Sequence, residues 1–160
     1  MLKSESIAAL AKAIALSQLH VENALKSSTN PHFKSKYADL AEIYESDSEY
    51  EVGTVVVFGG EKEITVSSMG SDPKVAGVIS GNPAYLMNAD ASGQPVALQG
   101  KVPCKVVGQI SKGDMLVTHS QHPGVARTGT NPAMGTVIGK ALEEYNSTEI
   151  GTINIVAGRQ

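Results

Sequence analysis

The sequence predicts a mainly β fold, a small β-barrel or sandwich preceded by an N-terminal α-helix. The hydrophobic fraction is 41% but only 4% of residues are aromatic, so valine, isoleucine and alanine must build the core. Sixteen glycines and seven prolines indicate many turns. About eight short strand patterns follow one another after residue 53 without helical periodicity between them. We therefore expect a helical segment over residues 1–37 and a β-rich domain over residues 38–160.

Residues 4–27 carry the pattern of one amphipathic helix, in which frequent alanine favours helix formation. The apolar face repeats at steps of three and four residues and consists of Ile7, Leu10, Ile14, Val21 and Leu25. Because Ile7, Ile14 and Val21 are seven residues apart, this face is expected to support oligomerisation through a short helical seam. The alternative is that it packs against its own domain.

The stretch after this helix decides where the β domain begins. Pro31 disfavours helix at the residue before it, so the helix is expected to end in this region. Residues 38–45, ADLAEIYE, fit either one or two further helical turns or an extended acidic strand. We expect Ala38 to Glu45 to pack as the first element of the β domain.

The remaining sequence is typical of strands separated by turns. We predict strands in GTVVVFGG (53–60) and KEITVSS (62–68), paired as a hairpin, and in KVAGVIS (74–80), SKGDMLVTHS (111–120), GTVIGKALEEY (135–145) and IGTINIVAGRQ (150–160). The stretch VALQGKVPCKVVGQI (96–110) is predicted as two strands broken at Gly100. Residues 82–95 and 119–134 are predicted as outward-facing loops.

Charge, hydropathy and cysteine content argue against several classes of function. Residues 37–160 hold eight basic and fourteen acidic side chains, which argues against a general nucleic-acid surface on the β domain. The single cysteine, Cys104, excludes an intrachain disulfide and is expected to be a small core residue. No apolar run approaches the roughly 18 residues that span a membrane, so we expect no membrane insertion. The N-terminal residues lack the pattern of a secretory signal.

Residues that could carry chemistry are few, and we predict no catalytic residue, no metal and no other cofactor. His119 and His122 form an H-x-x-H pair, which could hold a metal only if a third ligand joined them; Asp114 is the nearest carboxylate in sequence. We prefer the alternative of a polar loop near a strand end. Six acidic residues lie within residues 39–51 and suit a solvated or docking strip better than a glycosidase pair. The sequence has neither a nucleophile elbow nor a phosphate loop.

The segment NPHFKSKYADL (residues 30–40) places lysines beside aromatic residues, as single-stranded DNA sites do. Together with the sequence before it, this segment resembles the start of the essential-recombination-function family, which are phage single-strand annealing proteins. The resemblance covers about the first quarter of the chain, residues 1–44. It implies that Lys34, Lys36 and Tyr37 are the candidates for contact with single-stranded DNA. The family's annealing domain is much longer, so nucleic acid is not the partner that we expect.

A second resemblance begins inside the same segment and runs through the rest of the chain. The blocks that carry it occur in order and are ADLAEIYESDSEYEVGTVVVFGGEKEITVSS, KVAGVISGNPAYLMN, PVALQGKVPCKVVGQISKGDMLVTHSQHPGVA and GTVIGKALEE. They resemble the C-terminal β domain of phage tail fibres and appendages. In some appendage proteins that domain is an intramolecular trimerisation chaperone and cleaves itself. Self-cleavage would need an acidic group such as Asp39 or Glu42 beside the scissile bond.

The second resemblance implies a homotrimeric phage virion component of tail-fibre or appendage type, without enzymatic turnover. Its expected partners are further copies of itself, other virion proteins and a receptor on the host surface. It would be made in the host cytoplasm and located in the virion. The C-terminal strands are also similar to those of small capsid-decoration proteins. Capsid decoration and a truncated single-strand annealing protein are therefore the alternatives.

Overall fold

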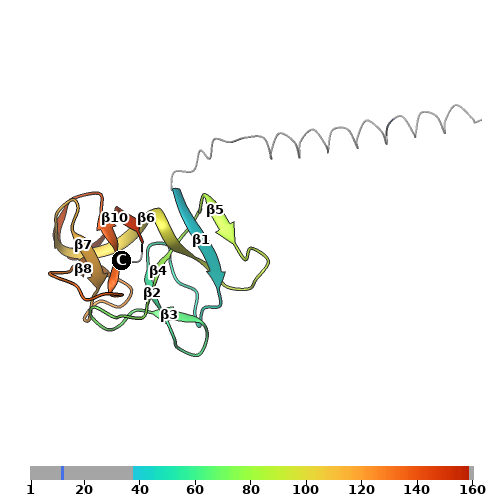
Figure 1. The fold of residues 1–160 in the computed structure, drawn as a ribbon, viewed down its shortest axis with the longest axis horizontal. Coiled ribbons are helices and arrows are strands. Elements are labelled where there is room, and N and C mark those ends of the chain that lie inside the picture. The colour runs from blue at the N-terminus through green and yellow to red at the C-terminus, as the bar shows by residue number, and fades with distance from the viewer. Residues whose placement is uncertain (1–11, 13–37, 159–160) are drawn as a thin grey trace, which may run out of the picture. The chain divides into compact units, whose positions relative to one another are not determined.

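The computed structural model describes residue 12 and residues 38–158. Apart from Lys12, the predicted helix over residues 4–27 lies outside the described residues. The same holds for its apolar face, Ile7, Leu10, Ile14, Val21 and Leu25, and for the DNA-contact candidates Lys34, Lys36 and Tyr37. The fold described below is that of the β-rich domain from Ala38 onward (Figure 1).

The described domain is mainly β, as the sequence predicts, and contains ten strands. They are β1 (Ala38–Tyr44), β2 (Val55–Phe58), β3 (Ile64–Val66), β4 (Val75–Ile79), β5 (Tyr85–Met87), β6 (Gln94–Ile110), β7 (Met115–Thr118), β8 (Ala126–Thr128), β9 (Val137–Ala141) and β10 (Tyr145–Ala157). The longest strand, β6, pairs with β1 and β4 over its first half and with β8 and β10 over its second half. β6 therefore belongs to both regions of the domain, a closed barrel and a second sheet region beside it.

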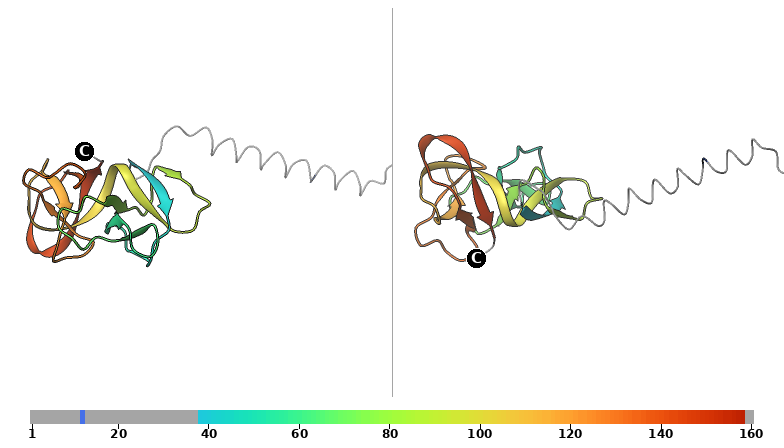
Figure 2. Two further views of the ribbon diagram at one scale, coloured as in Figure 1. Left: turned by 60° about the horizontal axis from the view of Figure 1, so that its bottom comes forward. Right: turned by 90° about the horizontal axis from the view of Figure 1, so that it is seen from above.

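Five strands close into a barrel (Figure 2). They run in the order β10, β9, β7, β8 and β6, and β6 pairs again with β10 to close the ring. Closure leaves none of these five strands at an open sheet edge. Small and branched side chains fill the interior, and the most completely buried include Val102, Val106, Leu116 and Ile155. Of the predicted alternatives, barrel or sandwich, the barrel is confirmed.

The first half of β6 carries a second region beside the barrel. β4, β2 and β3 extend the sheet on one side of β6, and β1 followed by β5 extends it on the other. The predicted hairpin between β2 and β3 is confirmed, with Val56 opposite Val66. A second hydrophobic cluster lies here, formed by Val56, Ile64, Ala76, Ile79 and Val96.

The segment ADLAEIYE, predicted as either helical turns or a strand, forms strand β1 over Ala38–Tyr44. It pairs antiparallel with β6 along its whole length and parallel with β5. Its side chains alternate, so that Asp39, Ala41 and Ile43 are buried and the residues between them are more exposed. The prediction that this segment is the first element of the β domain is confirmed, and the strand alternative is the correct one.

Gly100 is not a strand break, and this part of the sequence prediction is wrong. β6 continues through it as one strand of 17 residues. Gly100 lies opposite Asp39 of β1 and also opposite Ala157 of β10, so it marks the point where β6 changes partners. Its φ of +105° is accessible to glycine without strain. The glycine between two apolar runs therefore marks a boundary between two packing regions.

Two short strands lie where the sequence predicts uninterrupted loops, and the prediction is wrong at these places. β5, within residues 82–95, pairs with β1. β8, within residues 119–134, pairs with β7 and meets β6 at Val106 and Ala126. Each strand has three residues, too few for an alternating pattern to be recognised in the sequence.

Cys104 is expected to be unreactive in the folded protein. Its side chain is completely buried in the barrel core, as predicted, and burial raises the pKa of the thiol to about 12. Because the thiolate is the reactive form, a thiol-reactive dye should label the native chain about 100-fold or more slowly than the urea-unfolded chain. Equal labelling rates in the two states would contradict the buried position.

Candidate functional site

An apolar strip lies along the edge of the sheet formed by β1 and β5. We call it the β5 edge and define it by Leu40, Tyr85 and Leu86, which are 36%, 61% and 36% exposed. Leu40 and Tyr85 are paired in the parallel register, so their side chains share one face. Within the described residues β5 pairs only with β1, which leaves its outer side open to a further strand or an apolar surface.

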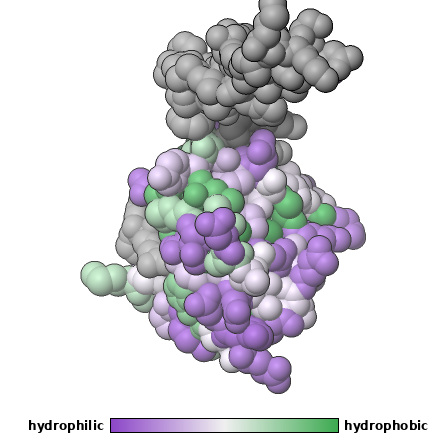
Figure 3. All heavy atoms as spheres, turned by 90° about the vertical axis from the view of Figure 1, so that its right-hand side faces the viewer, coloured by the Kyte–Doolittle hydropathy of each residue, from purple (hydrophilic) through white to green (hydrophobic). Residues whose placement is uncertain are grey.

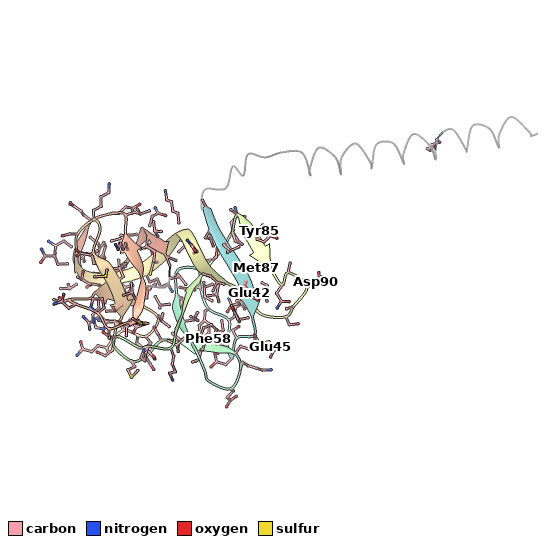
Figure 4. The ribbon with its side chains drawn as sticks, viewed as in Figure 1. Glu42, Glu45, Phe58, Tyr85, Met87 and Asp90 are labelled. Carbon is pink, nitrogen blue, oxygen red and sulfur yellow. The ribbon has the colours of Figure 1, made fainter. Side chains whose placement is uncertain are left out.

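The face beside the β5 edge carries aromatic and acidic side chains. Figure 4 shows Tyr85 and Met87 along β5, with Glu42 of β1 next to them. The hydroxyl of Tyr44 donates to the Glu42 carboxylate at 2.7 Å, and its ring packs edge-on against Phe58 with centroids 5.5 Å apart. Seen from this side, hydrophobic patches alternate with hydrophilic side chains (Figure 3). Such a mixed surface suits contact with another protein.

The acidic run after β1 makes local contacts instead of forming a paired-carboxylate site. The Lys105 ammonium lies 2.6 Å from the Glu51 carboxylate, and this contact lowers the pKa of Glu51. The Tyr50 hydroxyl donates to Asp47 and lowers the pKa of that carboxyl. These contacts hold the connection between β1 and β2 against the domain.

Asp39 and Glu42 do not converge on one site. Because β1 is extended, residues three apart point to opposite faces of the sheet. Asp39 is only 1% exposed, and within the described residues neither of its carboxylate oxygens has a hydrogen-bond partner. Burial raises the pKa of Asp39, and the nearby Ser80 hydroxyl is the main group that opposes this shift. The two carboxyls that the resemblance suggested for self-cleavage therefore lie in different environments.

A groove of about 360 Å³ opens in the barrel wall beside β6 and β8. β8 has a single registered pair with β6, between Ala126 and Val106, and the register of β10 against β6 shifts between Ser147 and Gly151. The groove lies where these irregularities occur. We call it the histidine groove, and the polar side chains that line it are Gln109, His119, His122, Arg127, Thr128 and Thr148.

His119 is held in one tautomer by the loop that follows it. Its Nδ1 accepts hydrogen bonds from the backbone N–H groups of Gln121, at 2.9 Å, and His122, at 3.3 Å. With Nδ1 as acceptor, the neutral ring carries its proton on Nε2. Partial burial lowers the pKa of His119, and electrostatic interactions with His122 and Arg127 lower it further. His119 therefore offers the groove an N–H donor while remaining neutral near pH 7.

The histidine pair does not assemble a metal site in the part of the chain that the structure describes. The two rings are close, with centroids 4.8 Å apart, but no cluster of three or more potential metal ligands occurs among the described residues. Asp114 instead accepts hydrogen bonds from the Ser111 N–H, at 2.9 Å, and from the Thr128 hydroxyl, at 3.2 Å. Asp114, the carboxylate that the metal alternative considered, therefore has other hydrogen-bond partners.

Sequence reasoning found the two histidines but missed the rest of the groove and the β5 edge. Arg127 and Thr148 are distant from each other in sequence, and only the pairing of β8, β6 and β10 brings them to one groove. For the β5 edge a signal was present. The apolar triplet Tyr85–Met87 interrupts a predicted loop, which is where an edge strand can be suspected.

Comparison with known proteins places the chain in no family. No family model matches it, and no curated protein matches it. Among the described residues, no helix is both long and apolar enough to cross a membrane.

Proposed function

We propose that the chain is a structural component of a phage virion, of tail-fibre or appendage type, that works as a homotrimer without catalytic turnover. One structural observation supports the proposal most directly. β1 lies between β5 and β6 as an integral strand of the β domain. The folded domain thus includes the segment ADLAEIYE from Ala38, the same segment in which the resemblance to fibre and appendage domains begins.

The β5 edge supports self-association. Leu40 and Tyr85 expose apolar surface beside a strand edge that is open within the described residues, a combination that oligomers commonly cover. Two further copies of the chain are the partners proposed for this edge, together with the predicted helical seam. Other virion proteins and a host-surface receptor are the partners proposed for the remaining surface.

Light scattering on the full chain at micromolar concentration is expected to give three times the 16.7 kDa chain mass. Tyr85→Lys should raise the concentration at which the trimer dissociates by about tenfold, because it introduces a charge at the β5 edge. Met134→Lys is the matched control, since Met134 is 92% exposed and belongs to the loop before β9. A parent chain that stays monomeric at this concentration would contradict the proposal.

A further inference from the structure

The histidine groove gathers positive and hydrogen-bond-donating groups without an acidic side chain in its lining. Within the described residues Arg127 takes no part in an ion pair, and its guanidinium donates to the Thr128 carbonyl at 3.0 Å. A guanidinium has five N–H donors, so most of them are left for a ligand. The Asp114 carboxylate, which is not part of the lining, accepts hydrogen bonds from the Ser111 N–H and from the hydroxyl of the groove residue Thr128.

The lining of the groove matches a small ligand that is both anionic and hydroxylated. Arg127 can hold a carboxylate through two parallel N–H donors, and the Nε2–H of His119 can add a third. The side chains of Gln109 and Thr148 are exposed at the same groove and can bind hydroxyl groups. The volume of about 360 Å³ lies at the lower end of the range for small-molecule sites, which suits one sugar unit.

We propose that the histidine groove binds the carboxylate of an acidic saccharide. Arg127 is the anchoring residue, His119 and His122 supply further donors, and Gln109 and Thr148 contact the sugar hydroxyls. This site goes beyond the virion role, and it is independent of the oligomeric state of the chain. If the groove binds no saccharide, the proposal of a trimer is unaffected. If the chain is a monomer, the proposal of a saccharide site is unaffected.

Nuclear magnetic resonance titration of the full chain tests the proposal with three probes: glucuronate, glucose and acetate. Glucuronate carries both the carboxylate and the hydroxyls, whereas each of the other two carries one of them. We expect saturable shifts at the amides around the groove and at least tenfold tighter binding of glucuronate than of either other probe. If glucose binds as tightly as glucuronate, the carboxylate is not the anchor of the ligand. If acetate binds as tightly as glucuronate, the groove does not recognise a saccharide. Absence of shifts at the groove with glucuronate would overturn the site itself.

Arg127→Met should weaken glucuronate binding at least tenfold, because it removes the charge and keeps most of the side-chain length. Lys140→Met is the matched control, since it removes one positive charge from an exposed position of β9, outside the groove. Arg127→Lys should bind with intermediate affinity, because it keeps the charge and loses the paired donors. Circular dichroism and thermal melting verify that each variant is folded. Equal losses in Arg127→Met and Lys140→Met would show only a general charge effect and would overturn the proposal.

Discussion

Gly100→Ala is expected to lower the free energy of unfolding by about 3 kcal/mol or more. A Cβ atom at this position would lie 2.3 Å from the carbonyl oxygen of Ala38 and 2.9 Å from the Cα of Asp39. Both are backbone atoms, so the clash can be relieved only by moving β1 away from β6. The φ of +105° adds a conformational penalty for any residue with a side chain. Urea unfolding followed by circular dichroism measures the loss.

Gly108→Ala is the matched control on the same strand. Gly108 has a φ of +92°, but a Cβ built on it meets no atom within 4 Å. It should therefore show the conformational penalty alone, roughly 1–2 kcal/mol. Hydrogen exchange should show that Gly100→Ala loosens β1 and β5 before the barrel. Equal losses in both variants would contradict the close approach of β1 to β6.

Strands whose pairing is local could be predicted from the sequence. β2 and β3 have alternating or β-branched residues and a short turn between them, so both the strands and their hairpin follow from local chemistry. β4, β7 and β9 also lie inside predicted strand segments, but their pairing was not predicted. The first strand, β1, was the harder case, because its buried face includes the acidic Asp39 as well as Ala41 and Ile43, so the apolar alternation of a strand is incomplete.

The parts that could not be predicted depend on contacts between distant residues. Gly100 has the local signature of a break, and only the presence of both Asp39 and Ala157 opposite it shows why the strand continues. β8 is held by β7 and by one pair with β6, which no local pattern encodes. Barrel closure likewise depends on the pairing of β10 with β6. The histidine groove is lined by residues of β6, of the segment after β7, of β8 and of β10, so its residues could not be grouped from sequence spacing.

Asp39→Asn is expected to stabilise the protein at neutral pH by about 1–3 kcal/mol. Within the described residues neither Asp39 carboxylate oxygen has a hydrogen-bond partner of normal geometry, and the nearby Ser80 hydroxyl offsets only part of the cost of burying the charge. Asparagine has almost the same shape and does not ionise, and its amide can donate to the nearby Ser80 hydroxyl, which also has no partner among the described residues. Urea unfolding of parent and variant at several pH values measures the difference.

The pH dependence of this difference identifies its cause. The Asp39 carboxyl has an ordinary pKa of 3.8 when exposed, and burial raises the pKa in the folded state. The fold accommodates the neutral carboxyl, so the buried Asp39 costs the parent no stability below about pH 3.8. As the pH rises through the raised folded-state pKa of Asp39, the carboxyl ionises and this contribution to stability is lost. The advantage of Asp39→Asn should therefore be smallest in acid and largest near neutral pH. Asp90→Asn, at an exposed loop position, should change stability by no more than about 0.5 kcal/mol at any pH. A parent chain that is more stable than Asp39→Asn at neutral pH, by a margin that grows with pH, would show that the carboxylate has a partner in solution.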